Sequence, residues 1–404
     1  MEKKSAVVLR NAGHGVNDLY WFILPSLLPL ILEQYDMKYG AAGGLLTAFL
    51  GVIAVFSFIL GRLSDRFSRQ KMLGLGFLVT SVFLICASLA DGFGLFVFFL
   101  LLAGIGVSSY HPTVYAFIEE TTASRRGRKY GMFEFWGSMA LFIMFFVHGL
   151  LLRKMNWKTI MLVTSLPGLA VGLLYLSHAR NLPSPPAAKE ETGLIGARAG
   201  DASPLLFALF LIVVAVRYFG IVAVVNFTPT YLVRELGLQK SIASFATGIY
   251  FLGGLIFTPF TGRLCDRKSP FLVLLAATGA AFPLIFLLSA TRSLWLLPLS
   301  LLLLGGTYYG AGPAMNMITA RMGDRMGKGE AFGWFMAITA VTYSFSPLLF
   351  GMNADRMGLR MSMRLFSYPL VLSSAVLLVL YLIVRPRPTS SSSPRSFRSH
   401  VRRP

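Results

Sequence analysis

Charged residues are scarce in this sequence of 404 residues: they make up 13% of it, against roughly 25% in a typical soluble domain. Hydrophobic residues account for 55%. The alternation of apolar and polar residues that marks the strands of a membrane barrel is also missing, so the long apolar runs are predicted to be helices. The composition therefore argues against a soluble globular protein and predicts an all-α integral membrane protein.

Cysteine is nearly absent as well. Cys86 falls inside an apolar run and Cys265 at a predicted inner loop, a placement that favours no disulfide and matches no metal-ligand spacing. The sequence contains no Gly-Lys-Ser/Thr nucleotide loop, no Cys/His metal cluster and no hydrolase elbow. We therefore expect no metal, no cofactor and no enzymatic activity. Without an ATP site, energy would come from an ion gradient or from the substrate itself.

Long apolar runs are abundant, and each is long enough to cross a hydrocarbon core roughly 30 Å thick. The first follows directly on Met-Glu-Lys-Lys with no small-residue cleavage site after it, which predicts an uncleaved span. We expect twelve transmembrane helices, near residues 14–33, 43–62, 72–91, 94–118, 130–152, 158–179, 205–233, 242–263, 271–290, 294–319, 331–352 and 364–384.

Basic residues outnumber acidic ones by 37 to 17, for a net charge of +20. If the N-terminus is inside, the inner loops and the two tails hold most of the Lys and Arg residues. This is the positive-inside bias, and it places both termini in the cytoplasm. The basic charge therefore orients the chain in the inner membrane, and no nucleic acid is expected as a partner.

One hexapeptide occurs twice. Gly-Arg-Leu-Ser-Asp-Arg at 61–66 returns 201 positions later as Gly-Arg-Leu-Cys-Asp-Arg at 262–267, and His111-Pro112 matches Gly312-Pro313 at the same spacing. Duplicated halves are typical of secondary transporters. The repeat predicts a six-helix half at 1–180, a cytoplasmic linker at 181–204, a second six-helix half at 205–385 and a disordered basic tail at 386–404.

Twelve spans, duplicated halves and this hexapeptide resemble the major facilitator superfamily. In that family the loop between helices 2 and 3 latches the cytoplasmic side and releases when the two halves rock. A topogenic loop without a switching role is the alternative, although topology alone needs no second acid at Asp266. The resemblance thus implies a conformational latch made of Gly61, Asp65, Arg66 and Arg69 and, in the second copy, Gly262, Asp266 and Arg267.

Two patches are more particular. Residues 13–20 in the first span and 104–112 in the fourth resemble the fosmidomycin-resistance group of efflux carriers. That resemblance implies export of a drug-like substrate. The fifth span lacks the glycine-proline motif that drug/proton antiporters often carry, so the export direction rests on these two patches.

Ionisable side chains inside predicted spans are costly, by roughly 2.5–3.5 kcal/mol on insertion scales, and usually face an aqueous cavity. His14 and Asp18 are four residues apart, so they share a helix face that suits proton binding and release. The alternative is that His14 lies at the interface and that Asp18 only satisfies backbone or a neighbouring helix. Glu134, set among aromatic residues, is a second proton candidate, or else a cap for the loop cations Arg125, Arg126 and Arg128.

Arg217 stays charged, so it cannot carry the proton, but it could clamp an anionic substrate or pair with an acid such as Asp18. His111 precedes a helix-bending proline, and its repeat partner is a glycine, which points to proton or substrate handling. A buried structural histidine is the alternative reading. Further side chains predicted to contact substrate are Asn17, Tyr110, Asn226, Tyr308 and Asn316.

The sequence therefore predicts a proton-coupled antiporter, a monomer in membrane lipid, that exports a small drug-like or metabolite substrate. An anionic substrate would suit Arg217. The nearest alternative is a proton symporter that imports a small organic solute. A non-transporting sensor or scaffold is disfavoured by the lack of an extra domain, and a lipid-modifying enzyme by the lack of a nucleophile–base pair.

Overall fold

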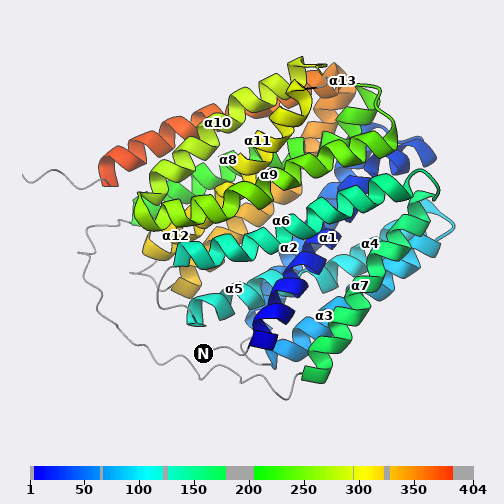
Figure 1. Cartoon of the computed structure of the whole chain (residues 1–404), viewed down its shortest axis with the longest axis horizontal. Helices are drawn as coiled ribbons and strands as arrows, with labels where there is room; N and C mark the ends of the chain where they lie inside the picture. The colour runs from blue at the N-terminus through cyan, green and yellow to red at the C-terminus, as the bar shows by residue number, and fades with distance from the viewer. Residues whose placement is uncertain are drawn as a thin grey trace, which may run out of the picture.

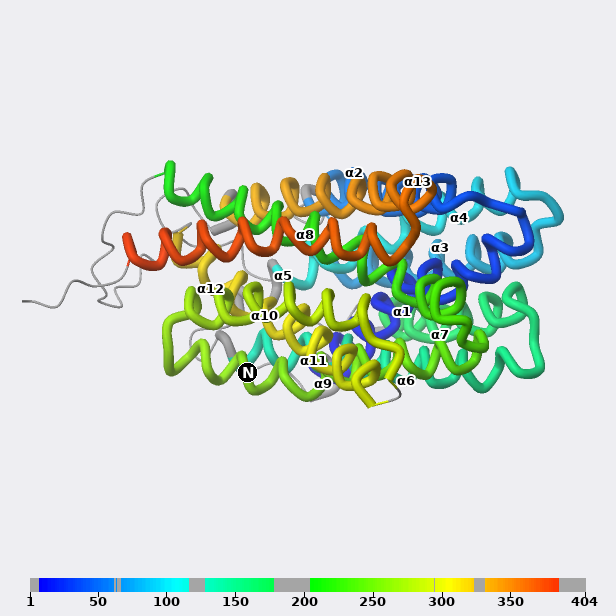
Figure 2. Tube along the Cα trace, turned by 90° about the horizontal axis from the view of Figure 1, so that it is seen from above, coloured from blue at the N-terminus to red at the C-terminus, as the bar shows by residue number. Residues whose placement is uncertain are grey.

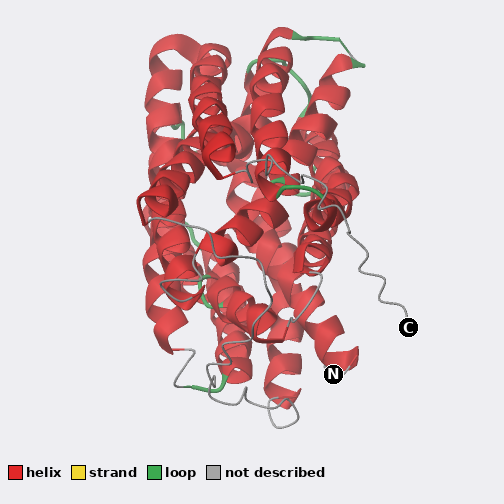
Figure 3. Ribbon diagram, turned by 90° about the vertical axis from the view of Figure 1, so that its left-hand side faces the viewer, coloured by secondary structure: helices red, strands yellow, loops and turns green. Residues whose placement is uncertain are grey.

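In a computed structural model, the described residues are 4–63, 67–121, 126–178, 204–293, 295–322 and 328–384. They are helical throughout, with short connecting loops and no strand among them, as Figure 3 shows in red. The helices, labelled in Figure 1, are α1 (Lys4–Gln34), α2 (Tyr39–Leu63), α3 (Arg69–Leu89), α4 (Phe93–Val107), α5 (Tyr110–Thr121), α6 (Arg126–Leu151), α7 (Trp157–His178), α8 (Pro204–Arg234), α9 (Lys240–Arg267), α10 (Pro270–Ala290), α11 (Leu296–Gly310), α12 (Gly312–Met322) and α13 (Lys328–Val384).

Ten described stretches are long and apolar enough to cross a membrane. The last of them, Ala331–Val384, contains two helices, because α13 turns at Gly358, where φ is 83° and favours glycine. The helices α11 and α12 follow one another across Ala311, so together they make one further crossing. Among the described residues, the helices thus supply the twelve crossings that the sequence predicts.

The fourth and tenth crossings are interrupted at equivalent positions. α4 ends at Val107 and α5 begins at Tyr110, while α11 ends at Gly310 and α12 begins at Gly312. Both new helices carry proline in their first turn, at Pro112 and Pro313, where the missing N–H costs no helical hydrogen bond. The break is therefore common to both copies of the repeat. Only the first copy places a histidine beside it.

Contacts between helices of the two sequence halves follow the repeat. The most extensive join α6 to α9 and α2 to α13, pairs that lie side by side in Figure 2. α6 and α9 are the fifth and eighth crossings, and their repeat counterparts are the eleventh and second, which lie in α13 and α2. A pseudo-twofold axis between the halves requires this correspondence. Most of the predicted linker and the tail at 386–404 lie outside the described residues, so the domain limits stay a prediction.

Two equivalent glycines differ in how closely a neighbour approaches. A Cβ on Gly305 would fall onto the backbone carbonyl of Tyr250 in α9, whereas a Cβ on Gly104 would meet only the side chains of Val52 and Phe49, at 3.3 and 3.5 Å. Backbone cannot yield as a side chain can. Overpacking typically costs about 1–3 kcal/mol. We therefore expect Gly305→Ala to lower the melting temperature of the purified protein in detergent by several degrees, and Gly104→Ala to change it little. Equal melting temperatures for the two variants would contradict this packing.

Candidate functional site

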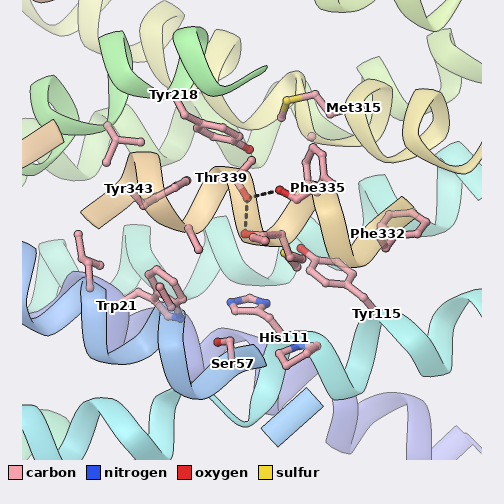
Figure 4. Close-up of a pocket in the computed structure, with 18 of the residues that line it drawn as sticks. Trp21, Ser57, His111, Tyr115, Tyr218, Met315, Phe332, Phe335, Thr339 and Tyr343 are labelled. Atoms are coloured by element: carbon pink, nitrogen blue, oxygen red, sulfur yellow. Dashed lines mark hydrogen bonds between the residues drawn. The ribbon is translucent and has the colours of Figure 1, made fainter. Parts of the chain in front are cut away.

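A cavity of about 1350 Å³ lies between helices from the two halves of the sequence. Its wall runs from Trp21 and Tyr343, in the middle of the bundle, to Gly61 and Phe332, next to the predicted cytoplasmic loops. Figure 4 shows aromatic side chains and His111 directed into it from several helices. The cavity therefore reaches the predicted inner side.

Asp18 lies on the cavity wall between two histidines. Its Oδ2 is 3.5 Å from His14 Nε2, and its Oδ1 is 3.4 Å from His111 Nε2. The other ring nitrogen of His14, Nδ1, lies 2.8 Å from the carbonyl oxygen of Phe133. A carbonyl only accepts hydrogen bonds, so this nitrogen carries a proton and donates it.

This hydrogen bond decides what His14 presents to Asp18. In a neutral imidazole with Nδ1 protonated, Nε2 is an acceptor, and here it faces a carboxylate oxygen at 3.5 Å. Two acceptors so close inside a protein are unfavourable unless a proton lies between them. His14 and Asp18 are both buried, with 1% and 8% of their surface exposed. This geometry is the one that a shared proton would need, and the proton-binding role of the pair stays a prediction.

Neighbouring side chains fix this cluster in place. The His14 ring stacks on Phe133 at 3.7 Å between centroids, and Gly137 leaves the space that the Asp18 carboxylate occupies. Asn17, with its amide turned to satisfy both neighbours, donates to the carbonyl of Val107 at 3.1 Å and accepts from the Trp21 indole at 3.2 Å. The i, i+4 pair from α1 is therefore held by residues of α4 and α6.

Glu134 lies on the same wall, on α6. It accepts a hydrogen bond of 3.0 Å from the Tyr115 hydroxyl, and its side chain is close to Gly312 of the second half. Its side chain therefore lines the cavity between the halves. Its alternative role as a cap for Arg125, Arg126 and Arg128 stays a prediction, and the side chains of the first two lie outside the described part.

Arg217 is fully buried in α8, but it does not line the cavity. Its Nη2 donates to the carbonyls of Thr307 and Tyr308, at 3.1 and 3.4 Å, and its guanidinium lies 5.5 Å from the centre of the Tyr218 ring. The pairing with Asp18 that the repeat allowed is not formed here. Arg217 instead ties α8 to α11 behind a tyrosine of the wall, and its contact with substrate stays a prediction.

Three other predicted substrate contacts line the cavity, namely Asn226, Tyr308 and Asn316. Tyr110 lies behind the wall, where its hydroxyl donates to the carbonyl of Arg10. The sequence reasoning did not select several aromatic wall residues, among them Trp21, Tyr115, Tyr218 and Tyr343. Trp21 follows Asp18 by three residues and so shares its helix face, a signal that was available. No such signal existed for Tyr343.

The far end of the bundle, predicted to be the outer end, is closed by contacts between the halves. Asp355 of α13 accepts from the backbone N–H groups of Tyr39 and Gly40, each at 2.8 Å. Lys240 pairs with Glu33 at 2.6 Å. Together with a cavity that extends towards the predicted inner loops, this closure leaves the arrangement open on the predicted inner side only.

Removal of the Asp355 carboxylate should loosen this closure. Hydrogen bonds to a charged group contribute roughly 1.5–3 kcal/mol each, so we expect Asp355→Ala to raise the outward-open population at least several-fold. The measurement is the rate at which an impermeant thiol reagent, added outside, modifies a cysteine placed at Asn226 on the cavity wall. Glu235→Ala serves as the control, because Glu235 pairs with Arg360 at 3.3 Å within the second half. An unchanged rate in Asp355→Ala would contradict the role of this contact.

At the inner end, the repeated motif also joins the halves. Asp266 Oδ2 accepts a hydrogen bond of 3.2 Å from the backbone N–H of Arg128 in α6, and a Cβ on Gly131 would lie 3.4 Å from Gly262. Gly61 lines the cavity, Arg69 begins α3, and Arg267 ends α9. Asp65 and Arg66 lie outside the described residues. The latch function of the motif stays a prediction.

The Major Facilitator Superfamily model matches residues 12–328 and 209–404. This chain belongs to the Major Facilitator Superfamily. It is a membrane transporter of small solutes and not an enzyme. Among curated relatives, the 4-hydroxybenzoate transporter PcaK of Acinetobacter baylyi is 23% identical over 351 residues, which cover 77% of this chain and 76% of the relative. Synaptic vesicle glycoprotein 2A of Rattus norvegicus is 25% identical over 198 residues, 41% of this chain but only 26% of that protein.

Solved structures show the same fold at low sequence identity. A bacterial homologue of the human lysosomal transporter Spinster, inward-facing and unoccupied, superposes with a TM-score of 0.74 at 15% identity, over 95% of this chain and 98% of its own. A mutant of the nucleoside transporter NupG gives 0.73 at 14% identity, over 93% and 99%. The superfamily prediction is confirmed, while membership in the fosmidomycin-resistance group stays a prediction.

Proposed function

We propose that this transporter is a proton-coupled antiporter that exports a small drug-like or metabolite solute. The observation that carries the proposal is Asp18 on the cavity wall, within 3.5 Å of His14 Nε2 and 3.4 Å of His111 Nε2. One further proton fits between these groups, and the cavity brings a solute to them. The proton gradient is the proposed energy source.

The mechanism follows from alternating access. With the outer end held by Asp355 and by Glu33–Lys240, a solute enters from the inner side. Its binding displaces the proton shared by Asp18 and the histidines, and the halves then rock to open the outer end. After the solute leaves, a proton from outside returns the site to its first state. One elementary charge moved through 100 mV contributes about 2.3 kcal/mol, or about a fiftyfold gradient.

Four titratable groups would set the pH dependence of this exchange. Asp18 and His14 come from α1, His111 from α5 and Glu134 from α6. Protonation of any one of them makes the cavity wall less negative. Proton binding therefore changes the affinity of the wall for a charged solute, and solute binding changes its affinity for the proton. We also propose that the protein works as a single chain in the inner membrane with both termini in the cytoplasm, as the positive-inside bias indicates.

Proton-driven export can be tested in inverted membrane vesicles, in which respiration acidifies the lumen. A transported solute should dissipate the pH difference, as a pH-sensitive dye reports, and vesicles without the protein should not respond. Solutes for this assay would come from a comparison of drug sensitivity between cells that lack the protein and cells that overproduce it. If every solute that discriminates those cells leaves the pH difference unchanged, antiport is the wrong mechanism.

A symporter that imports an aromatic acid is the second candidate. It is favoured by the likeness to the 4-hydroxybenzoate transporter, which extends over 77% of this chain. In that case, 4-hydroxybenzoate added to lightly buffered, energy-depleted cells should make the medium more alkaline. The antiporter predicts no such alkalinisation.

A further inference from the structure

We infer that the cavity binds organic cations that carry aromatic or alkyl groups, and that these are the substrate class of the transporter. The claim that these cations are transported rests on the proposed function. The claim that the cavity binds them does not depend on it. It departs from the anionic substrate that Arg217 suggested in the sequence.

The first argument is the charge of the wall. Two carboxylates, Asp18 and Glu134, line the cavity, and no Lys or Arg is among the lining residues that the structure describes. Arg217 lies behind Tyr218 and donates to backbone carbonyls. With both acids ionised and both histidines neutral, the wall carries a net negative charge that favours a cation, and with both histidines protonated its net charge is zero. In neither state does the described wall offer excess positive charge to an anion, although the Arg217 guanidinium lies behind it, 5.5 Å from the centre of the Tyr218 ring.

The second argument is the shape of the aromatic part of the wall. Trp21 of α1 meets Tyr343 of α13 at 6.1 Å between ring centroids and 77° between planes, and Tyr218 lies 5.0 Å from the same tyrosine. The hydroxyl groups of Tyr308 and Tyr343 are hydrogen-bonded to each other. With these hydroxyls paired, the rings are left to contact a ligand through their carbon surfaces. Figure 4 shows Trp21, Tyr218 and Tyr343 around one part of the cavity.

These four rings form what we call the aromatic cage, made of Trp21, Tyr218, Tyr308 and Tyr343. Aromatic faces attract cations through the ring quadrupole, Trp most strongly, and repel anions by the same term. The cage contains residues of both halves, so a cation within it would touch both moving parts. Neutral aromatic solutes would also pack there, but they would gain nothing from the carboxylates.

The carboxylates lie within reach of the cage. Asp18 precedes Trp21 by three residues on α1, so the two share a helix face. Glu134 lines the same cavity and accepts a hydrogen bond of 3.0 Å from Tyr115. A quaternary ammonium or phosphonium ion held by the cage would thus have an acid nearby. Its arrival would compete with the proton on that acid, and this competition links the binding preference to antiport.

The test is equilibrium binding of tetraphenylphosphonium to the whole protein in nanodiscs, with the signal of protein-free nanodiscs subtracted. We expect saturable binding. Trp21→Ala should weaken it by roughly tenfold, which lies between the values for an exposed and a fully desolvated cation–π contact. The double variant Asp18→Asn/Glu134→Gln should weaken it by more than tenfold. Glu235→Gln, which alters a carboxylate outside the cavity, should leave it unchanged.

Phenylphosphonate, an aromatic anion, is the competitor that tests whether the cavity discriminates against anions. It should not displace bound tetraphenylphosphonium at millimolar concentration. Displacement, or no saturable binding of the cation, or full binding by the double variant, would each overturn the inference. A variant that unfolds is recognised by its elution profile. In that case Trp21→Phe replaces Trp21→Ala and should keep binding, because the ring face remains.

Failure here can be told apart from failure of the proposed function, because binding needs no gradient. If tetraphenylphosphonium binds as described but never dissipates a pH difference in vesicles, the binding preference stands and proton antiport falls. If a pH difference is dissipated only by anions or neutral solutes, antiport stands and the cation preference falls.

Discussion

Asp18→Asn is expected to abolish proton-driven transport while leaving exchange of solute across the membrane intact. Asparagine keeps the size of the side chain and offers an amide group to His14 and His111, but it has no carboxylate to take up the proton. Solute binding and the rocking of the halves do not require that proton once solute is present on both sides. The measurement is solute flux in proteoliposomes, first with an imposed pH difference and then in counterflow without one.

The matched control is Glu235→Gln, which makes the same chemical change in an acid paired with Arg360 outside the cavity. It should transport normally in both assays. Normal proton-driven flux in Asp18→Asn would remove Asp18 from the coupling mechanism. Loss of counterflow together with driven flux would show a role in solute binding or folding rather than in coupling.

Gly137→Ala should reduce proton-driven transport nearly as much, although residue 137 carries no chemistry of its own. A Cβ at this position on α6 would collide with the Asp18 carboxylate and lie 2.8 Å from His14 Cε1. The carboxylate must then move away from the histidines. Because both substitutions act on one group, Gly137→Ala, like Asp18→Asn, should keep exchange of solute in counterflow while it loses driven flux. Solute flux in proteoliposomes, with and without an imposed pH difference, is the measurement.

Gly248→Ala tests whether glycine replacement by itself accounts for the loss. Gly248 lies in α9 against α6, but a Cβ there would meet Phe145 at an ordinary 3.5 Å. This variant should keep near-normal driven flux and stability. Loss of counterflow together with driven flux in Gly137→Ala would show that the added methyl group acts elsewhere than on Asp18.

Much of the architecture could be predicted because membrane crossing imposes simple requirements. A helix that crosses needs a long apolar run, and the repeat spacing of 201 residues joined each crossing to its counterpart. The proline at 112, with its repeat partner at 313, predicted a bend in the fourth span and in its counterpart. The structure places a full break there, because α4 ends at Val107 and α11 at Gly310, a few residues before each proline. The turn at Gly358, between the predicted spans 331–352 and 364–384, agrees with a loop at that place.

The candidate site was predictable where its residues are close in sequence. His14 and Asp18 share a face by helical spacing alone. His111 was selected because of its neighbouring proline, but its place at 3.4 Å from Asp18 needed the packing of α5 against α1. Arg217 shows the opposite case. Its charge marked it as important, yet packing turned it towards carbonyls of α11 and away from the cavity.

The sequence by itself determined that this is a twelve-span, duplicated membrane transporter, with a predicted orientation and an acid–histidine pair on its first helix. Only the tertiary structure decided which side of each helix faces the cavity. Lipid tails are as apolar as a buried leucine, so the lipid-facing and the inward-facing sides of a span read alike in sequence. Tyr218 and Tyr343 therefore joined Trp21 on one wall through packing that no sequence periodicity records.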